Sequence, residues 1–478
     1  MFAARLCRRT VATFTHKKIN TILPLLEKAL PAGQVSVSEA VREHHAHDES
    51  HHHQHLPDIV VTPNSVDEVA AVVRICNENT VPVIPFGTGT GLEGGVTAIT
   101  GGVCIDLLGM DQILDLNIDD FDVTVQPGVT RKTLNAYLHD TGLWFTVDPG
   151  ADASICGMCA TSASGTNAVR YGTMKEVVQN LQVVLPSGQI VHTRGKHRRS
   201  KKSAAGYNLT NLFIGSEGTL GVITAATLRL FPYPEKIASA VCSFPSIKQA
   251  CDTVLQTFQC CVPMARIEFM DDVQLDACNK FSNLNYPVQP TLFLEFHGSE
   301  QDVHVQAELV GEICAANEGS DFEWSLMPEE RERLWKARHD AYYAALALKP
   351  NCKGFTTDVC VPVSKLADVL NDTKLDIEQS KLVGPIVGHV GDGNFHCIFV
   401  VDPDNQEEMQ ATRDISDRIV KRALAAGGTC TGEHGIGLGK RHYLEEEFGT
   451  DTLHLMRTVK LAFDPNNIMN PGKVFHPH

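Results

Sequence analysis

PFGTGTGLEGG, residues 85–95, is the stretch on which the fold assignment depends most. It follows a short apolar run and has glycines at 89, 91 and 94, the G-x-G-x-x-G spacing of a nicotinamide-dinucleotide fold. That fold requires a helix to open at the third glycine. Here GGVTAITGGVCIDL, residues 94–107, is β-rich and broken by glycines, so a helix-dipole site for nicotinamide nucleotides is disfavoured. The loop instead predicts a nest of backbone N–H groups for a pyrophosphate.

Two further stretches are equally poor in large side chains. They are VDPGADASICGMCATSASGTNAVRYG, residues 147–172, and NLFIGSEGTLGVIT, residues 211–224. An ordinary glycine-rich turn explains one such loop but not three. A large, flat cofactor lying against the backbone is the simplest reason for so many missing side chains.

Patterns typical of helices and strands surround these stretches. A chain of 478 residues is expected to form two or three domains. Ser65 and Glu68 form a capping-box pattern that opens a helix over about 65–79. Its expected buried stripe is Val66, Val69, Val73 and Cys76. A boundary falls at Pro232 and Pro234. Beyond it, strand patterns such as ARIEFM and TLFLEFHG alternate with helices, which predicts an antiparallel sheet covered by helices in an α+β protein.

The N-terminus has a different composition from the rest of the chain. Residues 1–26 carry Arg and Lys, and no acid precedes Glu27, which is typical of a mitochondrial transit peptide; the alternative is a disordered basic tail. Seven histidines then crowd into HHAHDESHHHQH, residues 44–55, within a polar lead-in over 27–56. Such a tract can bind metals loosely, but a solvated low-complexity linker is favoured.

Composition excludes several functions. The formal net charge of −16 argues against a nucleic-acid partner, so the basic run RGKHRRSKK, residues 194–202, is interpreted as a solvated loop. No run of about 18 apolar residues appears, so no transmembrane segment is predicted. Cys156 and Cys159 form a C-x-x-C pair, but no second pair completes a metal site. A packing role is therefore favoured over a redox role.

GHVGDGNFH, residues 388–396, places two histidines on either side of a tight turn. His389 and His396 could converge from its two arms, and imidazole pairs bind Zn, Mn or Fe with a carboxylate to complete the site. Glu433 in TGEHGIGLGK offers that carboxylate, and His434 follows it. By residue type alone, such a metal site and incidental histidines are equally good interpretations.

The three glycine-rich stretches together resemble the FAD-binding domain of the vanillyl-alcohol oxidase flavoprotein family. This resemblance implies a two-part FAD-binding domain of the vanillyl-alcohol oxidase (PCMH) type over 57–233, a substrate domain over 234–426, and a C-terminal segment, 427–478, that returns to the flavin. No histidine lies between Pro85 and Gly95, so FAD is expected to be non-covalent. The residues implied to bind it are Pro85, Gly87, Thr88, Gly89, Thr90, Gly91, Leu92, Gly94, Gly95, Pro149, Ala151, Gly157, Thr161, Gly165, Thr166, Ala168, Glu217, Gly218, Ile223 and Asn470.

HVGDGNFH and GEHG also resemble the D-2-hydroxyacid dehydrogenase branch of this family. By that resemblance His389, His396 and Glu433 bind a divalent metal ion, Zn or Mn, and His434 is the catalytic base. Arg338, in a W-x-x-R context with Trp335, is implied to hold the substrate carboxylate. The implied reaction removes the hydroxyl proton and transfers the Cα hydride to flavin N5.

Stretches such as WKARHDAYYA and TDVCVPVS resemble the mitochondrial, cytochrome-linked branch that acts on D-lactate. The implied substrate is D-lactate or a D-2-hydroxy acid with a small or aliphatic tail, and the implied acceptor is cytochrome c or another carrier, in the matrix or at the inner membrane. D-2-hydroxyglutarate dehydrogenases are the alternative. They tend to carry Lys and Asn where this chain has Thr356 and Ile398, which disfavours a second substrate carboxylate. A matrix metal-binding protein is the non-enzymatic alternative.

Overall fold

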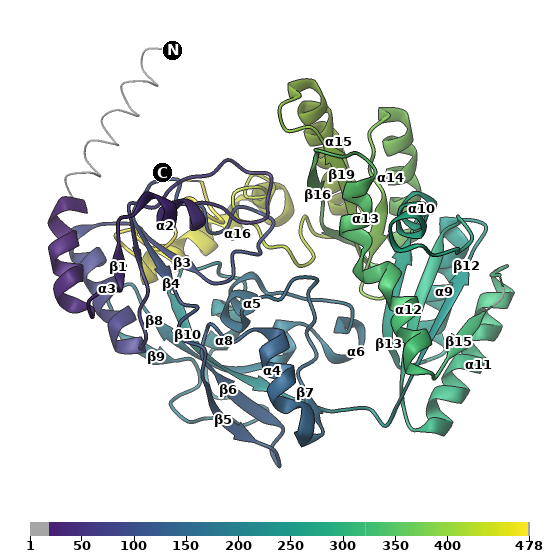
Figure 1. Cartoon of the computed structure of the whole chain (residues 1–478), viewed down its shortest axis with the longest axis horizontal. Helices are drawn as coiled ribbons and strands as arrows, with labels where there is room; N and C mark the ends of the chain where they lie inside the picture. Colours follow the sequence, from purple (N-terminus) through teal and green to yellow (C-terminus); the bar gives the residue numbers. More distant parts are fainter. Residues whose placement is uncertain (1–18, 321, 477–478) are drawn as a thin grey trace.

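The protein folds into two lobes, with the C-terminal helix α16 (Leu444–Phe463) lying on the first of them (Figure 1). The computed structural model describes residues 19–320 and 322–476. The expected transit peptide lies mostly outside these residues. Residues 19–29 are helical, however, and Ile22 and Leu26 in this helix are fully buried. The described part of the expected transit peptide, residues 19–26, therefore contributes to the hydrophobic core, and the boundary at residue 26 stays a prediction.

The first lobe begins with a four-stranded sheet in which three strands are parallel. Its order is β1 (Val35–Ser36), β2 (Ile59–Val61), β4 (Val103–Asp106) and β3 (Val83–Phe86). Helix α3 (Val66–Asn79) connects β2 to β3 and starts where predicted, because the Ser65 side chain accepts from the Glu68 N–H. Val69, Val73 and Cys76 are fully buried against the sheet, whereas Val66 is only partly buried.

A second, antiparallel sheet completes this lobe and, with the first sheet, forms the predicted two-part domain. Its order is β5 (Ile113–Asn117), β6 (Asp122–Val125), β10 (Val222–Arg229), β8 (Val178–Val184) and β9 (Ile190–His192). Short elements surround it: α2 (Glu39–His44), α4 (Arg131–Leu138), η1 (His139–Thr141), β7 (Leu143–Trp144), α5 (Ile155–Thr161), α6 (Ala168–Tyr171), α7 (Met174–Val177), α8 (Leu209–Phe213) and β11 (Phe231–Pro232).

The second lobe is the predicted antiparallel sheet covered by helices. The sheet order is β15 (Glu323–Ser325), β12 (Lys236–Ser243), β14 (Thr291–Gly298), β13 (Met264–Met270), β18 (Ile386–Gly388), β19 (Asn394–Val401) and β16 (Lys353–Thr356), with β17 (Val359–Cys360) also on β19. One face packs on α9 (Ile247–Gln259), α11 (Glu300–Ala316), η2 (Val363–Lys365), α14 (Leu366–Ser380) and α15 (Gln406–Ala425). The other packs on α10 (Asp272–Ser282), α12 (Pro328–His339) and α13 (Ala341–Ala347).

The C-terminal segment closes the open edge of the first sheet. Val83 of β3 donates its N–H to the carbonyl of Ile468, and Asn470 donates its N–H to the carbonyl of Val83, both at 2.8 Å. Lys460 of α16 also donates to the carbonyls of Thr219 and Met469. Residues 460–470 are therefore part of the first lobe.

The histidine tract is only partly the solvated linker that its composition predicts, because four of its histidines are exposed and three are not. His45 is 5% exposed and its Nε2 lies 3.0 Å from the Asp106 carboxylate. The ring of His51 stacks on Phe355 of the second lobe, with centroids 4.1 Å apart. Burial lowers the pKa of His51 to about 3, so this imidazole is neutral and can lie in an apolar contact. Composition could not show this, because histidine is found at both buried and exposed positions.

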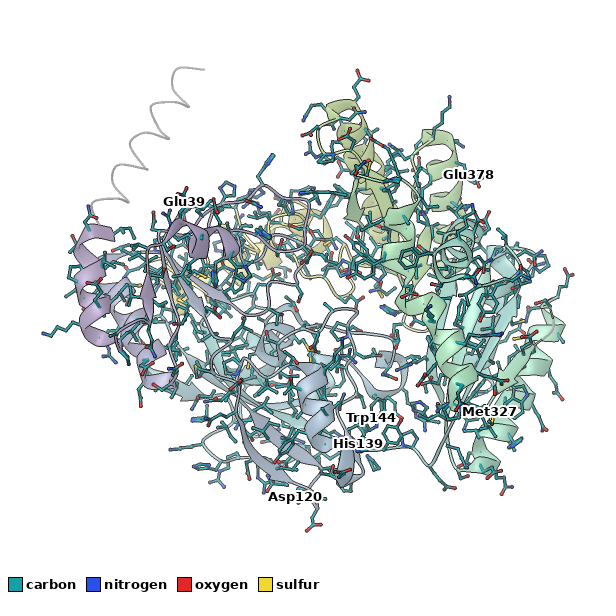
Figure 2. The ribbon with its side chains drawn as sticks, viewed as in Figure 1. Glu39, Asp120, His139, Trp144, Met327 and Glu378 are labelled. Atoms are coloured by element: carbon teal, nitrogen blue, oxygen red, sulfur yellow. The ribbon has the colours of Figure 1, made fainter. Side chains whose placement is uncertain are left out.

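The two lobes meet around Arg266 of β13. Its guanidinium lies 3.3 Å from the Asp148 carboxylate of the first lobe and 3.5 Å from Glu295 of β14. A cavity of about 650 Å³ adjoins it, with Trp144 on one side and α12 on the other. Figure 2 shows Trp144 on the side of the first lobe that faces the second, where Met327 marks the start of α12.

Two further findings concern the described residues. Among them, no helix has the length and apolar character needed to cross a membrane. Cys156 and Cys159 lie buried in α5, and the cysteines of the described ranges are all free thiols. Burial raises the pKa of Cys156 well above its usual range, as expected for a packing residue.

Candidate active site

The glycine loop leaves the end of β3 and lies against the second small-residue stretch. The Ser154 N–H donates to the Thr88 hydroxyl, and a Cβ on Gly87 would lie 2.3 Å from the Ser154 hydroxyl oxygen. Gly89 and Gly94 have φ of +68° and +72°, a conformation that other residues rarely adopt. Residues 87–92 are partly exposed. A curled, accessible backbone without side chains fits a pyrophosphate-bearing cofactor.

Asn470 joins the loop to the third small-residue stretch. Its side-chain amide donates to the carbonyl of Gly95 at 2.9 Å and to the carbonyl of Glu217 at 2.7 Å. A Cβ on Gly218 would lie 3.0 Å from the Pro85 ring. Predicted cofactor residues of the first and third stretches thus lie next to one another, and the side chain of Asn470 links the two stretches.

The second stretch is held by Asp148, which precedes the predicted residues. Its carboxylate accepts from the Thr166 hydroxyl at 2.6 Å and from the Asn167 N–H at 3.0 Å. Gly165 approaches the backbone of Asp148, where a Cβ would come within 2.6 Å of the carbonyl carbon. The segment from 148 to 168 therefore folds back on itself and presents small residues along one edge.

The side chain of Glu217 also has partners within the protein. Its carboxylate accepts from the N–H groups of Ile436 and Gly437, both at 2.7 Å. The side chain is 8% exposed, and burial raises its pKa. Glu217 therefore anchors the loop that carries Glu433 and His434 to the glycine-rich lobe.

The three predicted metal ligands converge. His389 follows β18, His396 lies in β19, and Glu433 lies in the loop before α16; one ligand atom of each lies within 4.8 Å of the other two. Oε1 of Glu433 is 3.0 Å from Nε2 of His389 and 3.2 Å from Nε2 of His396. All three side chains are nearly buried, so this cluster is not an incidental surface group.

The outer nitrogens of both imidazoles already have partners. Nδ1 of His389 lies 2.7 Å from the Glu268 carboxylate, and Nδ1 of His396 lies 3.2 Å from the carbonyl of Thr357. Both partners are acceptors, because His389 and Arg338 lower the pKa of Glu268 against its burial. Each Nδ1 therefore carries a proton, and each Nε2 faces Glu433. Against the effect of burial, the Glu268 and Glu433 carboxylates hold the pKa of His389 well above its usual range, so the cluster favours a positive charge between these groups. A divalent cation held by both Nε2 atoms and Glu433 would supply that charge, and imidazole ligands oriented through Nδ1 are typical of metal sites.

The loop of Glu433 is shaped by a second carboxylate, that of Asp358. Its Oδ2 accepts from the N–H groups of three successive residues, Gly432, Glu433 and His434, at 2.8, 2.9 and 2.9 Å. Lys440 lies 3.3 Å from the same oxygen. Burial opposes ionisation of Asp358, but Lys440 and the neighbouring histidines hold its pKa well below its usual range.

His434 lies beside the cluster rather than within it. Its ring stacks on that of His396 with centroids 4.8 Å apart and an interplanar angle of 11°. Nδ1 of His434 is buried and has no hydrogen-bond partner among the described residues. Burial lowers the pKa of His434 to about 4, so the ring is neutral near neutral pH.

Arg338 reaches the same cluster from α12. Its Nε donates to Glu268 at 2.7 Å, on the carboxylate oxygen that does not face His389. Within the described parts of the chain, this is the hydrogen bond that Arg338 makes, so its two terminal amino groups stay available for an anion. The guanidinium is thus oriented by one carboxylate and able to fork onto another.

Glu268 and Asp358 were not identified from the sequence as site residues. Both lie within stretches that were recognised as strands or as family-like, MARIEFM and TDVCVPV. An acidic residue inside an apolar strand was the available signal, because a buried carboxylate needs a partner. Glu268 is in fact fully buried and has two.

Comparisons with known proteins agree with this architecture. Residues 57–194 match the family described as FAD binding domain, and residues 233–474 match FAD linked oxidases, C-terminal domain. The chain is similar to the "Probable D-lactate dehydrogenase, mitochondrial" of Danio rerio, with 61% identity over 440 residues, 92% of this chain and 88% of that protein. It is 45% identical to the "D-lactate dehydrogenase [cytochrome], mitochondrial" of Arabidopsis thaliana over 88% of this chain and 74% of that protein.

A solved structure with a similar fold is that of p-cresol methylhydroxylase with substrate bound. It superposes with a TM-score of 0.79 at 16% identity and covers 97% of this chain and 98% of that one. At this identity the likeness shows the fold, which is the one that the glycine-rich stretches predicted.

Proposed function

Because this chain belongs to the family of FAD-linked oxidases, within which it groups with the D-lactate dehydrogenases, we propose that it oxidises D-lactate to pyruvate with FAD and a divalent metal ion, Zn or Mn. The observation that supports this most is the convergence of His389, His396 and Glu433 beside Arg338. A 2-hydroxy acid offers matching groups, since its hydroxyl and carboxylate can chelate one cation while the carboxylate also accepts from an arginine.

Each residue then has a defined task. Bound FAD supplies the hydride acceptor, and a bound metal ion lowers the pKa of a hydroxyl group. Arg338 binds the substrate carboxylate through its terminal amino groups and is kept in position by Glu268. His434 is neutral and has an unpartnered, buried Nδ1, so it can take the hydroxyl proton as general base.

The residues proposed to hold FAD are those of the three small-residue stretches together with Asn470. Nothing in the chain between Pro85 and Gly95 offers an imidazole for a covalent link, so FAD is proposed to be bound non-covalently. The contact of Asn470 with the carbonyls of Gly95 and Glu217 supports a role for this residue in keeping the cofactor loop closed.

The substrate range is proposed from the pair Thr356 and Ile398. Thr356 of β16 pairs with Ile398 of β19, and Ile398 is two residues from His396 in the same strand. Alternate residues of a strand point to the same side, so both side chains lie on the sheet face of His396. Ile398 is 3% exposed, and the Thr356 hydroxyl is buried without a hydrogen-bond partner among the described residues. No cation stands at these two positions, so a small or aliphatic tail is favoured over the second carboxylate of D-2-hydroxyglutarate.

The electron acceptor and the compartment are proposed from the relatives. Those of Danio rerio and Arabidopsis thaliana are named as mitochondrial, and the latter as a cytochrome-type enzyme. We therefore propose cytochrome c, or another external carrier, as acceptor, and a location in the mitochondrial matrix or at the inner membrane.

Anaerobic flavin reduction tests the proposal. The purified protein should be yellow, and D-lactate should bleach its flavin absorbance while L-lactate does not. Removal of the metal by a chelator should abolish the bleaching, and added Zn²⁺ or Mn²⁺ should restore it. Bleaching by D-2-hydroxyglutarate at far lower concentration would favour that alternative, and a colourless protein would favour the metal-binding one. His434→Ala should retain FAD and metal but lose flavin reduction.

A further inference from the structure

A second cavity, of about 400 Å³, lies at the far end of the antiparallel sheet of the first lobe. Its walls come from the start of β8, the end of β10 and the basic loop that follows β9. We call it the basic pocket, and its lining consists of Glu176, Val178, Gln179, Arg194, Lys201, Lys202 and Arg229. Arg229 is the last residue of β10, whereas Ile223 of the proposed FAD site is near the first. Six residues of strand separate them by roughly 20 Å.

The charges in the basic pocket are unbalanced. Four cations line it against one acid, Glu176, and that acid is already engaged, because its Oε2 accepts from the N–H and the hydroxyl of Thr173 at 2.7 Å. Lys201, Lys202 and Arg229 have no ion-pair partner among the described residues. Like charges without a counter-charge repel one another; solvent screens part of this repulsion at the exposed Lys201 and Lys202, and a bound anion would offset the rest.

One cation of the basic loop outside the basic pocket, Arg199, does have counter-charges. Arg199 of the same loop pairs with Asp120 and Asp122, at 3.2 and 2.8 Å. Asp120 lies at the outer tip of the first lobe (Figure 2). Arg194 is also held in place, since it donates to the carbonyls of Gln179 and Ser200. The loop is therefore anchored at Arg194 and Arg199 and presents the intervening and following cations to solvent or to the basic pocket.

Gln179 adds a second, independent observation. Its side chain is 7% exposed and lines the basic pocket, yet its Oε1 has no hydrogen-bond partner among the described residues. A buried amide left without a partner is costly. Rotation of the amide exchanges its oxygen and nitrogen, so the same side chain can present an N–H group to an anion in the cavity.

We propose that the basic pocket binds the phosphate group of a ligand. A phosphate monoester carries about −1.5 to −2 charges at neutral pH and offers several acceptor oxygens. It therefore offsets the three excess positive charges better than a carboxylate does. Arg229 supplies a planar fork for two phosphate oxygens, and the two lysines supply point charges. The phosphate could belong to a soluble compound or to a lipid headgroup.

Two probes distinguish these sources. Inorganic phosphate and pyrophosphate are titrated by calorimetry at constant ionic strength, which tests a soluble ligand. Flotation with vesicles of phosphatidylcholine, with and without about one fifth phosphatidic acid, tests a headgroup. We expect the wild-type protein to bind at least one of these phosphate probes and not the pure phosphatidylcholine vesicles.

Matched variants show whether the basic pocket is responsible. K202Q/R229Q removes two cations of the basic pocket and should weaken phosphate binding roughly tenfold or more. K196Q/R198Q removes two exposed cations from the same loop outside the basic pocket and should leave binding unchanged. Both variants should keep the wild-type urea-unfolding midpoint. Equal losses in the two variants would mean general charge attraction, and no binding of either probe by the wild type would also overturn the proposal.

Discussion

Nδ1 of His389 lies 2.7 Å from the Glu268 carboxylate, so a residue of β13 orients a residue that follows β18. The other oxygen of Glu268 accepts from Arg338 at 2.7 Å. One buried carboxylate thus orients the side chains of both a proposed metal ligand and the proposed substrate-binding arginine. We therefore expect metal binding and substrate binding in the second lobe to depend on Glu268 as well as on the ligands themselves.

Glu268→Gln should lower metal affinity by about 10- to 100-fold while FAD is retained. A glutamine can still accept from His389, but its amide N–H₂ would face the Nε–H of Arg338. Metal content after titration with a fluorescent chelator measures the loss. Glu295→Gln is the matched control, because Glu295 is a buried carboxylate of β14 that pairs with Arg266 and His297 instead. Equal losses in both variants would remove the special role of Glu268.

Arg338→Lys should reduce kcat/KM for D-lactate by about 100-fold. A lysine keeps the charge, but it cannot contact Glu268 and fork onto a substrate carboxylate at the same time. Steady-state kinetics give the change. Lys336→Arg, on an exposed position of α12, should leave kcat/KM at the wild-type value. A wild-type kcat/KM in the Arg338 variant would show that another group holds the carboxylate.

Asp358→Asn should loosen the loop from Gly432 to His434. The single amide oxygen of asparagine cannot replace a carboxylate oxygen that accepts from three N–H groups beside Lys440, and one broken buried pair costs about 3–5 kcal/mol. Hydrogen exchange of the amides of 432–434 should therefore accelerate. Asp372→Asn, at an exposed position of α14, serves as control and should not change that exchange. Unchanged protection in the Asp358 variant would contradict the proposed role.

Asn470→Ala should weaken FAD binding by about tenfold. The substitution removes two hydrogen bonds that tie the glycine loop to the third stretch, each contributing about 0.5–1.5 kcal/mol. The dissociation constant comes from reconstituting the apoprotein with FAD. Asn466→Ala, in the same tail but bonded to Asn77 at the surface, should bind FAD as the wild type does. Comparable FAD affinity in the two variants would argue against closure by Asn470.

Alkylation should distinguish the two kinds of cysteine. Cys260 and Cys261 are exposed and should react with iodoacetamide in the native protein, whereas the buried Cys156 and Cys159 should react only after denaturation. Mass spectrometry of the labelled peptides shows which cysteines have reacted. Fast native labelling of the Cys156 and Cys159 pair would revive the redox interpretation of the C-x-x-C motif.

The local parts of the fold and site were predictable because their cause is local. The cap at Ser65, the strand patterns of β13 and β14, and the bend between His389 and His396 all follow from neighbouring residues. That Glu433, in a distant loop, joins these two histidines was implied by the resemblance to known flavoproteins.

The features that the sequence did not predict depend on contacts between distant segments. Glu268 becomes a site residue only because β18 pairs with β13, a register that no local pattern encodes. The histidine tract was misjudged for a similar reason. Its polar composition predicts solvent exposure, but His45 and His51 find partners in Asp106 and Phe355, which lie far along the chain.

The pairing of β3 with residues 468–470 has a consequence for how the protein is made. The loop after β3 emerges from the ribosome early, but its hydrogen bond to Asn470 and the partner for its strand edge exist only once residues 468–470 have been translated. We therefore expect the chain to bind a dinucleotide only late in its synthesis. A nascent chain that stalls before residue 468 would leave the first sheet with a bare edge.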